Sequence, residues 1–332
     1  MKAFVRPFDL SQSPLIRAGV WYDNDGDCFL FMDSHHIIGD GLSTSILFHR
    51  LNSLYLGHDV DVPFSYIDYA WNEAKFGSSE PVALQYWMNQ LSPVPEQLNL
   101  IGDYSRQHEF DFQGNQHVFS LGEDLSKACD LYCKEKGITS FMLFLSAFSF
   151  FISKLSGKKD FVIGIPSAGR KNSAAQDICG PFIHTLPLRI NAGAASKVLY
   201  LENIKNLVNE ALDHQYVSLE EIIAELNLSR GTQNSLYQIM FSQSPVNKEK
   251  LLLGDEMIEF IPSSDTTVKM DLTCESEKIG DIYSFSIHYA TQLFLPETIA
   301  YFGRCLKQII SSLIEDEQQD MRSLQVLSPE DI

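Results

Sequence analysis

Basic residues are scarce in this sequence of 332 residues, which has 25 lysines and arginines against 43 aspartates and glutamates and a formal charge of −18. Such an acidic surface repels phosphate groups, so we expect no binding to nucleic acid and none to an anionic membrane. Long apolar runs are also missing. The longest, residues 141–152, contains two serines and is far shorter than the ~20 residues of a membrane span. No signal peptide is visible, so we predict a cytoplasmic protein.

Patterns for metal binding and disulfides are equally absent. Six scattered cysteines do not form a disulfide scaffold. Cys129 and Cys133 share a predicted helix, but no histidine or further cysteine lies near enough in the sequence to suggest zinc. The acidic stretch at residues 23–27 lacks the glycine and glutamate that an EF-hand loop requires, because Cys28 and Ser34 occupy those positions. We therefore expect no bound metal.

The remaining composition, with 45% hydrophobic and 20% charged residues, is that of a globular protein. At roughly 100–200 residues per domain, the length suggests two domains or lobes. Strands and helices follow one another without strict alternation, which favours a mixed α/β sandwich over a Rossmann fold. Periodicity predicts helices over residues 42–56, 82–91, 124–136, 140–155, 202–214, 219–226 and 296–314, and strands over residues 18–22, 28–33, 117–121, 160–165, 186–190, 237–242, 257–261, 269–275 and 283–289.

The sharpest motif is His35-His36-x-x-x-Asp40-Gly41, on a loop between a predicted strand and a predicted helix. A neutral histidine is the natural proton acceptor near neutrality, since its ordinary pKa is about 6.5. The Gly41 amide at the helix start is a candidate donor to an oxyanion. Asp40 is expected to orient the loop by pairing with an arginine. The alternative is a histidine pair that only satisfies hydrogen bonds at the end of a strand.

Other sequence patterns narrow the chemistry. The sequence has no Gly-x-Ser-x-Gly elbow and no cysteine in a nucleophile context, so the motif predicts direct acyl transfer to a nucleophile that the substrate brings. The segment Gly164-x-Pro166-x-x-Gly169-Arg170 lacks the spacing of a phosphate-binding loop, and we interpret it as a tight turn after a buried strand. Three isolated histidines are expected to be structural: His184, His214 and His288.

Taken together, these motifs resemble a condensation domain of a non-ribosomal peptide synthetase, in the chloramphenicol-acetyltransferase-like superfamily. The resemblance runs over nearly the whole chain. Residues 35–43 match the family signature HHxxxDGxS. Four further segments are similar to family motifs with some residues changed: 66–71, 178–185, 214–220 and 230–236.

The sequence departs from the family pattern at its start, which has no match to the family's opening segment with its SxAQxR and RHExLR motifs. The arginine that usually pairs with the motif aspartate lies in that segment. Arg17 is the nearest substitute, and we predict that it pairs with Asp40. We therefore expect a truncated N-terminal lobe with exposed sheet edges, which leaves the activity of this chain alone open.

The resemblance implies a two-lobed, V-shaped pseudo-dimer of acetyltransferase-like lobes with a site between them. Residues 1–112 would form the partial N-terminal lobe with the motif, and residues 113–332 the C-terminal lobe. It further implies that His36 acts as the base or positions the amine, with His35 beside it. Asp40 would be structural, and the Gly41 amide would be the oxyanion donor.

The implied reaction is peptide-bond formation between an acyl or peptidyl thioester and an aminoacyl thioester, each on a carrier protein. No cofactor would be bound permanently, because the phosphopantetheine arms travel with the carriers. The implied partners are the donor and acceptor carriers and neighbouring synthetase domains. Two alternatives stay open: an epimerisation domain, which shares the histidine motif, and a non-catalytic module that docks synthetase partners.

Overall fold

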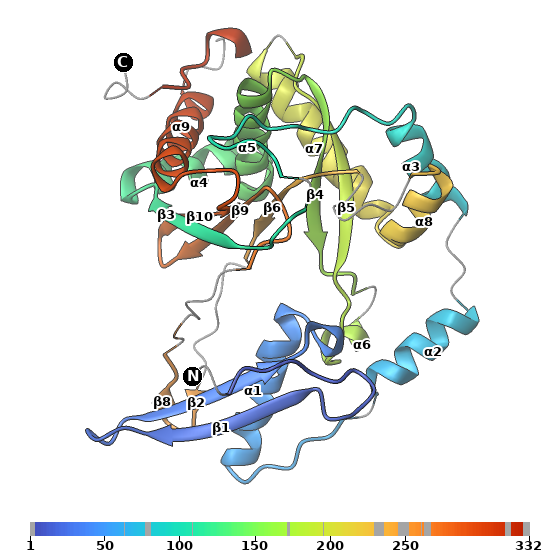
Figure 1. Cartoon of the computed structure of the whole chain (residues 1–332), viewed down its shortest axis with the longest axis vertical. Coiled ribbons are helices and arrows are strands. Elements are labelled where there is room, and N and C mark those ends of the chain that lie inside the picture. Colours follow the sequence, from blue (N-terminus) through green and yellow to red (C-terminus); the bar gives the residue numbers. More distant parts are fainter. Residues whose placement is uncertain are drawn as a thin grey trace. The chain divides into compact units, whose positions relative to one another are not determined.

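The computed structural model describes residues 4–62, 64–76, 81–107, 109–170, 173–194, 196–228, 236–244, 252–259, 261, 267–315 and 320–327 (Figure 1). Their contacts divide the chain into two compact units. Unit 1 comprises residues 1–78, 168–183 and 249–260, and unit 2 the remainder. The sequence suggested one boundary at residue 112. The contact units do not follow a single boundary, because two later segments of the chain pack within unit 1.

Unit 2 is built on a six-stranded sheet with the strand order β3-β10-β9-β6-β4-β5. β4 pairs with β6 and β6 with β9 in parallel, while the other neighbours are antiparallel. This mixed pairing confirms the predicted mixed α/β architecture. The strands are β3 (Gly114–Ser120), β4 (Asp160–Ser167), β5 (His184–Asn191), β6 (Ile239–Gln243), β9 (Leu272–Ile279) and β10 (Ile282–Ala290).

Four helices pack on this sheet (Figure 1), and they are α4 (Glu123–Lys136), α5 (Ser140–Ser156), α7 (Lys197–Asp213) and α9 (Pro296–Ile314). The core lies between them and the sheet. α5 is the most enclosed element, since every residue from Met142 to Ile152 is buried. That burial explains an apolar run that continues around the whole helix rather than along one stripe. Near β5, helices α3 (Pro81–Leu91) and α8 (Leu219–Glu225) pack against each other.

Unit 1 begins with the hairpin β1 (Ile16–Tyr22) and β2 (Cys28–Ser34), as the sequence predicted. At its tip, one carboxylate oxygen of Asp23 accepts hydrogen bonds from the amides of Asp25 and Asp27, both at 2.9 Å. The acidic stretch therefore closes a turn. The unit also contains the 3-10 helix η1 (His36–Ile38), α1 (Gly41–Tyr55), α2 (Tyr66–Phe76), α6 (Ser173–Gln176), β7 (Leu252–Leu253) and β8 (Glu256–Met257).

Most predicted elements are confirmed within a few residues, and α9 has the predicted bounds. The helix α2 was missed, because residues 66–71 stood out in the sequence only as a family-like motif. The strand expected over residues 257–261 is represented by Met257 in β8, and residue 260 lies outside the described residues, as do residues 230–235 of the last family-like motif. Within the described part of the chain, no single helix has the length and apolar character to cross a membrane.

Candidate functional site

The two motif histidines lie between β2 and α1, and their hydrogen bonds assign opposite tautomers. The Nδ1 atom of His36 lies 2.8 Å from the carbonyl oxygen of Gly39. Because a carbonyl oxygen only accepts, a neutral His36 ring carries its proton on Nδ1 and has a free lone pair on Nε2. His35 instead accepts a hydrogen bond at Nδ1 from the Ile37 amide, at 3.1 Å. Its neutral ring therefore carries the proton on Nε2.

These tautomers divide the possible roles of the two side chains. His36 is exposed and presents an unprotonated nitrogen, which is what a proton acceptor requires. His35 is half-buried and is the N-cap of η1, so its ring helps to fix the loop. The role of His36 as the base, which the family resemblance implies, stays a prediction with which this geometry is compatible.

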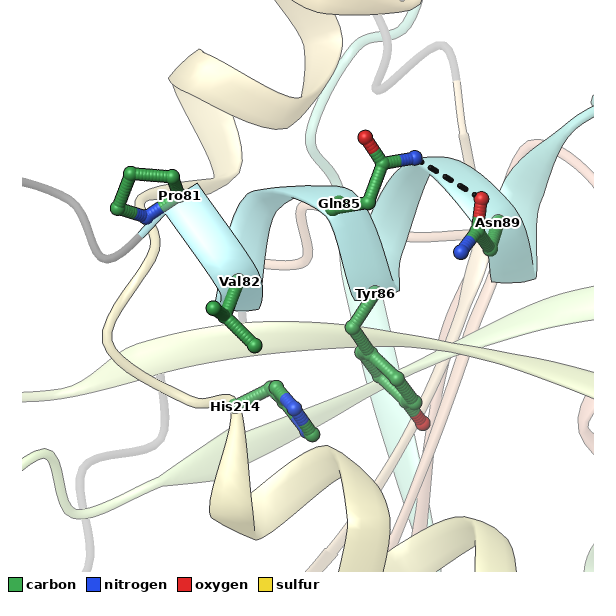
Figure 2. A pocket seen from close by; sticks show the side chains of 6 residues that line it. All are labelled: Pro81, Val82, Gln85, Tyr86, Asn89 and His214. Atoms are coloured by element: carbon green, nitrogen blue, oxygen red, sulfur yellow. Dashed lines mark hydrogen bonds between the residues drawn. The ribbon is translucent and has the colours of Figure 1, made fainter.

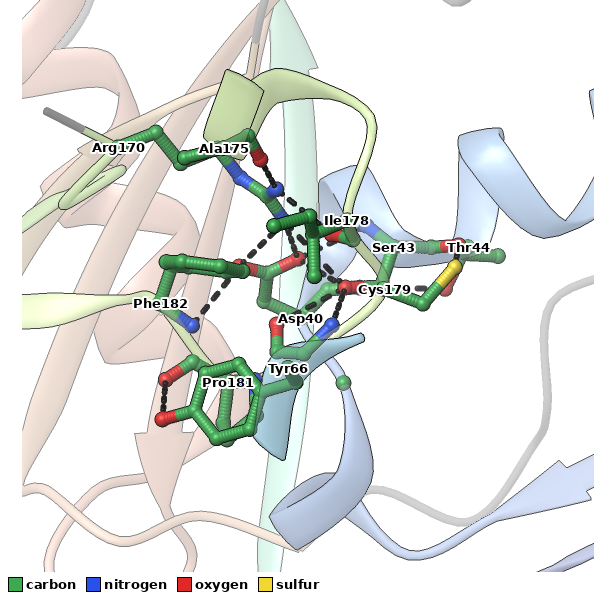
Figure 3. A network of polar contacts seen from close by, with 12 residues as sticks. Asp40, Ser43, Thr44, Tyr66, Arg170, Ala175, Ile178, Cys179, Pro181 and Phe182 are labelled. Carbon is green, nitrogen blue, oxygen red and sulfur yellow. Dashed lines mark hydrogen bonds and ion pairs between the residues drawn. The ribbon is translucent and has the colours of Figure 1, made fainter. Parts of the chain in front are cut away.

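Asp40 faces away from this chemistry and caps α1. Its Oδ1 atom accepts hydrogen bonds from the amide and the hydroxyl of Ser43, at 2.8 and 2.7 Å. The guanidinium of Arg170 lies 3.1 Å away, and the Phe182 amide lies 3.3 Å from Oδ2 (Figure 3). Among the described residues, no hydrogen bond joins Asp40 to either histidine. This position fits the expected structural role of Asp40.

The predicted pairing of Arg17 with Asp40 is wrong. Arg17 donates to Asp33 at 2.8 Å, and these two residues face each other across the hairpin. The partner of Asp40 is Arg170, which the sequence placed in a tight turn after a buried strand. The turn itself is present, since Gly169 has a φ of +65°. Arg170 reaches Asp40 because the β4–β5 connection, residues 168–183, packs within unit 1.

The Asp40–Arg170 pair is buried and well supported. The side chains are 2% and 1% exposed. Arg170 also donates to the carbonyl oxygens of Ala175 and Ile178, the latter at 2.7 Å, and its guanidinium lies 4.1 Å from the centre of the Phe182 ring. Burial alone would raise the pKa of Asp40. The hydrogen bonds from Ser43 and the charge of Arg170 outweigh it and hold that pKa below its ordinary value.

Segments that resemble three family motifs meet in this network. Both backbone polar groups of Gly180 lie 2.9 Å from the hydroxyl oxygen of Ser43. A Cβ at position 180 would lie 2.1 Å from the Tyr66 ring, so only glycine fits there. The Phe182 ring packs edge-on against Tyr66 and Tyr69, at centroid distances of 5.1 and 4.8 Å. Ser43 and Gly180 lie within the family-like segments 35–43 and 178–185, whose spacing in the sequence does not predict this contact.

Gly41 is the first residue of α1 and is exposed. Amides in the first turn of a helix have no acceptor within the helix, so they are available to an outside group. The oxyanion role of Gly41 stays a prediction, because no group in the structure marks where an oxyanion would lie.

A second cluster forms around His214 in unit 2 (Figure 2). Its ring stacks on Tyr86 at a centroid distance of 4.1 Å, and its Nδ1 atom lies 2.8 Å from the Glu210 carbonyl oxygen. Burial and the nearby Glu210 carboxylate raise the pKa of Tyr86. Both rings line an open depression of about 550 Å³. The contacts fit the predicted structural role of His214. No cluster of metal-binding side chains occurs among the residues that the structure describes.

The mixed sheet of unit 2 is consistent with the predicted chloramphenicol-acetyltransferase-like fold. Solved structures support this class at the level of fold. A four-domain nonribosomal peptide synthetase bound to AMP and glycine superposes with a TM-score of 0.88 over 98% of this chain and 26% of that chain, at 21% identity. The X-domain from teicoplanin biosynthesis gives 0.84 over 98% of this chain and 78% of that chain, at 19% identity.

The chain belongs to the Condensation domain family, whose model matches residues 1–331. It is 32% identical to surfactin synthase subunit 2 from Bacillus subtilis strain 168 and 31% identical to tyrocidine synthase 3 from Brevibacillus parabrevis. Each alignment covers 99% of this chain, but only 9% and 5% of those relatives. The chain therefore spans a small part of the synthetases that it matches.

Proposed function

We propose that this domain joins an acyl or peptidyl thioester to the amine of an aminoacyl thioester, each carried by a partner protein. The proposal rests on the hydrogen bonding of the His36 ring. Its Nδ1 atom is fixed by the Gly39 carbonyl and its Nε2 lone pair is free, on a loop next to the buried Asp40–Arg170 pair. Condensation domains in general are acyl-transferring enzymes that form amides, and this site has the proton acceptor for that reaction.

The step balances without an added reagent. The acceptor amine attacks the thioester carbonyl, a C–N bond forms, the C–S bond breaks, and the thiolate leaves. The amine loses a proton to Nε2 of His36, and the imidazolium passes that proton to the leaving thiolate. A free α-amine has a pKa of about 8, so positioning of the amine contributes alongside proton transfer. The amide of Gly41 would stabilise the oxyanion, and His35 would hold the loop.

The same proposal includes the partners and the place of action. Donor and acceptor carrier proteins would bring the substrates on phosphopantetheine arms, so the domain needs no cofactor of its own. Neighbouring synthetase domains would be further partners, and the reaction would take place in the cytoplasm. The lobe boundary near residue 112 also stays a proposal, distinct from the contact units of the structure.

The test is a single-turnover assay with both carriers charged, in which the condensed product is released and quantified by mass spectrometry. We expect His36→Ala to lower the rate at least ~100-fold, in line with the usual contribution of a positioned acid–base group. His58→Ala is the matched control, because His58 is an exposed histidine after α1 and outside the motif. Equal rates for wild type and His36→Ala would refute catalysis by this histidine and favour the docking alternative.

An epimerisation domain is the second candidate, since it shares the histidine motif. The same proteins distinguish it. One carrier is loaded with an L-aminoacyl group, no donor is added, and the chirality of the released amino acid is measured. Appearance of the D-form, lost in His36→Ala, would assign epimerisation. Unchanged chirality together with product formation in the two-carrier assay assigns condensation.

A further inference from the structure

The hydroxyl of Ser43 occupies a crowded polar position in unit 1. Its oxygen lies 2.7 Å from Asp40 Oδ1, 2.9 Å from both the nitrogen and the oxygen of Gly180, and 3.4 Å from Arg170 Nη2. The residue is only 6% exposed. One small side chain thus joins the N-terminus of α1 to a segment more than 130 positions away in the sequence.

The hydrogen bonds use the full capacity of this hydroxyl. A serine hydroxyl has one proton and two lone pairs. The lone pairs accept from the Gly180 amide and from Arg170, and the proton goes to either Asp40 or the Gly180 carbonyl. An alanine here would leave the Gly180 amide without this acceptor in a buried place. The Gly180 backbone would then lose its bonds to the motif helix, while the Cys179 thiol keeps its bond to the Ser43 carbonyl oxygen.

The direction of this hydroxyl also matters for His36. Ser53 and Ser146, which lie inside their helices, bond the carbonyl oxygens four positions earlier, those of His49 and Met142. For Ser43 that carbonyl belongs to Gly39, and it is the acceptor of His36 Nδ1. Gly39 precedes the N-cap Asp40 in extended backbone, and the Ser43 hydroxyl holds Asp40, the residue next to this carbonyl. Gly39 and Ser43 are also close, since a Cβ on Gly39 would lie 3.1 Å from the Ser43 Cβ.

We propose that Ser43 is a positioning residue that acts through the Gly39–Asp40 backbone to hold His36 in its Nδ1–H tautomer. The inference rests on the proposed function of His36 and names a further residue of the same site. Ser43 does not touch the reacting atoms in this account. Its hydroxyl bonds Asp40 and Gly180, and it thereby fixes the backbone next to the Gly39 carbonyl that His36 binds.

The first test measures kinetics in the two-carrier assay with Ser43→Ala, and uses Ser53→Ala as the matched control in the same helix. We expect kcat to fall ~10- to 100-fold, with KM within ~3-fold of wild type, as misplacement of a catalytic group produces. In a His36→Ala background the same change should have little further effect, because the group that Ser43 positions is gone. A purely structural role would lower the residual rate in that background as well.

The second test reads the tautomer directly and does not depend on activity. In protein labelled with ¹⁵N-histidine, the His36 ring nitrogens are assigned by comparison with His36→Gln. We expect a predominantly Nδ1–H form in wild type and in Ser53→Ala, and a shift towards Nε2–H in Ser43→Ala. Ser43→Cys, which keeps the size but is a poor hydrogen-bonding group, should give an intermediate shift.

The outcomes separate this inference from the proposed function. If His36→Ala matches wild type, the proposed function fails, and the tautomer spectrum still decides whether Ser43 positions His36. If His36→Ala is inactive while Ser43→Ala behaves like Ser53→Ala in both tests, Ser43 is not a positioning residue and the function stands. Loss of the fold in both Ser43 variants, with Ser53→Ala folded, would make Ser43 a stability residue and overturn the inference.

Discussion

Replacing Arg170 with methionine removes the charge that faces the Asp40 carboxylate and keeps much of the side-chain volume. Both side chains are 1–2% exposed, so Asp40 would remain as a buried charge without its partner. Breaking a buried pair in this way costs about 3–5 kcal/mol. The variant also loses two donors to carbonyl oxygens and the contact with the Phe182 ring. That is a large part of the ~5–15 kcal/mol that stabilises a typical protein.

The pH dependence of this loss follows from the pKa of Asp40. In the folded protein that pKa is lowered, so the stability that the ionised carboxylate contributes is present above its unfolded value, near 4. It is lost as the pH falls through the lower folded value. In Arg170→Met the folded pKa rises. The stability gap between variant and wild type should therefore be full at pH 7 and shrink as the pH falls below about 5.

The assay combines urea unfolding with hydrogen exchange of the backbone amides of α1, which report on unit 1 alone. The double variant Arg170→Met/Asp40→Asn is the informative control, because it removes the stranded charge and should recover part of the loss. A loss below about 1 kcal/mol in Arg170→Met would refute the reasoning. So would a double variant that is less stable than Arg170→Met.

Three further changes test other parts of the structure. Gly180→Ala should lower stability by about 2 kcal/mol or more, since its Cβ would meet the Tyr66 ring at 2.1 Å, and Tyr66→Ala should relieve part of that loss in urea unfolding. Lys197→Met should loosen the end of α9, because the buried ammonium donates to the Ser312 carbonyl at 2.9 Å. Faster hydrogen exchange confined to the last turn of the helix would show this loosening. Asp271→Ala should lower the free energy of unfolding by about 3 kcal/mol, because it removes the carboxylate that Arg106 binds through two nitrogens. A thermal midpoint unchanged from wild type would contradict this.

Elements with strong local signals were predictable from the sequence. α9 has an apolar stripe and a proline in its first turn, so both ends were correct. α5 was found as a buried helix because its apolar run is long and continuous. The strand ends were placed with errors of up to four residues, since a strand ends where its neighbour stops pairing. β9 starts at Leu272, where both β6 and β10 provide partners, and not at the predicted residue 269.

The site was predictable in its residue types and only partly in its contacts. The predicted hairpin was enough to find the true partner of Arg17. A turn over residues 23–27 places residues 17 and 33 opposite each other, so Asp33 was the nearer partner. The pairing of Asp40 with Arg170 spans 130 positions, and no periodicity or spacing encodes it. The packing of the β4–β5 connection within unit 1 decides it, and that is a property of the tertiary fold.

The contacts of the motif side chains favour one nitrogen for the proposed proton transfer. Asp40 is ionised at neutral pH and its oxygens are occupied by Ser43, Arg170 and the Phe182 amide, so it has neither the pKa nor the access to take a proton from an amine. Nδ1 of His35 accepts from a backbone amide, and Nδ1 of His36 donates to a carbonyl. When both rings are neutral, Nε2 of His36 is the motif nitrogen that keeps a lone pair without a hydrogen bond to the described residues. The proposed mechanism therefore depends on the groups that fix Nδ1 of His36 as strongly as on the ring itself.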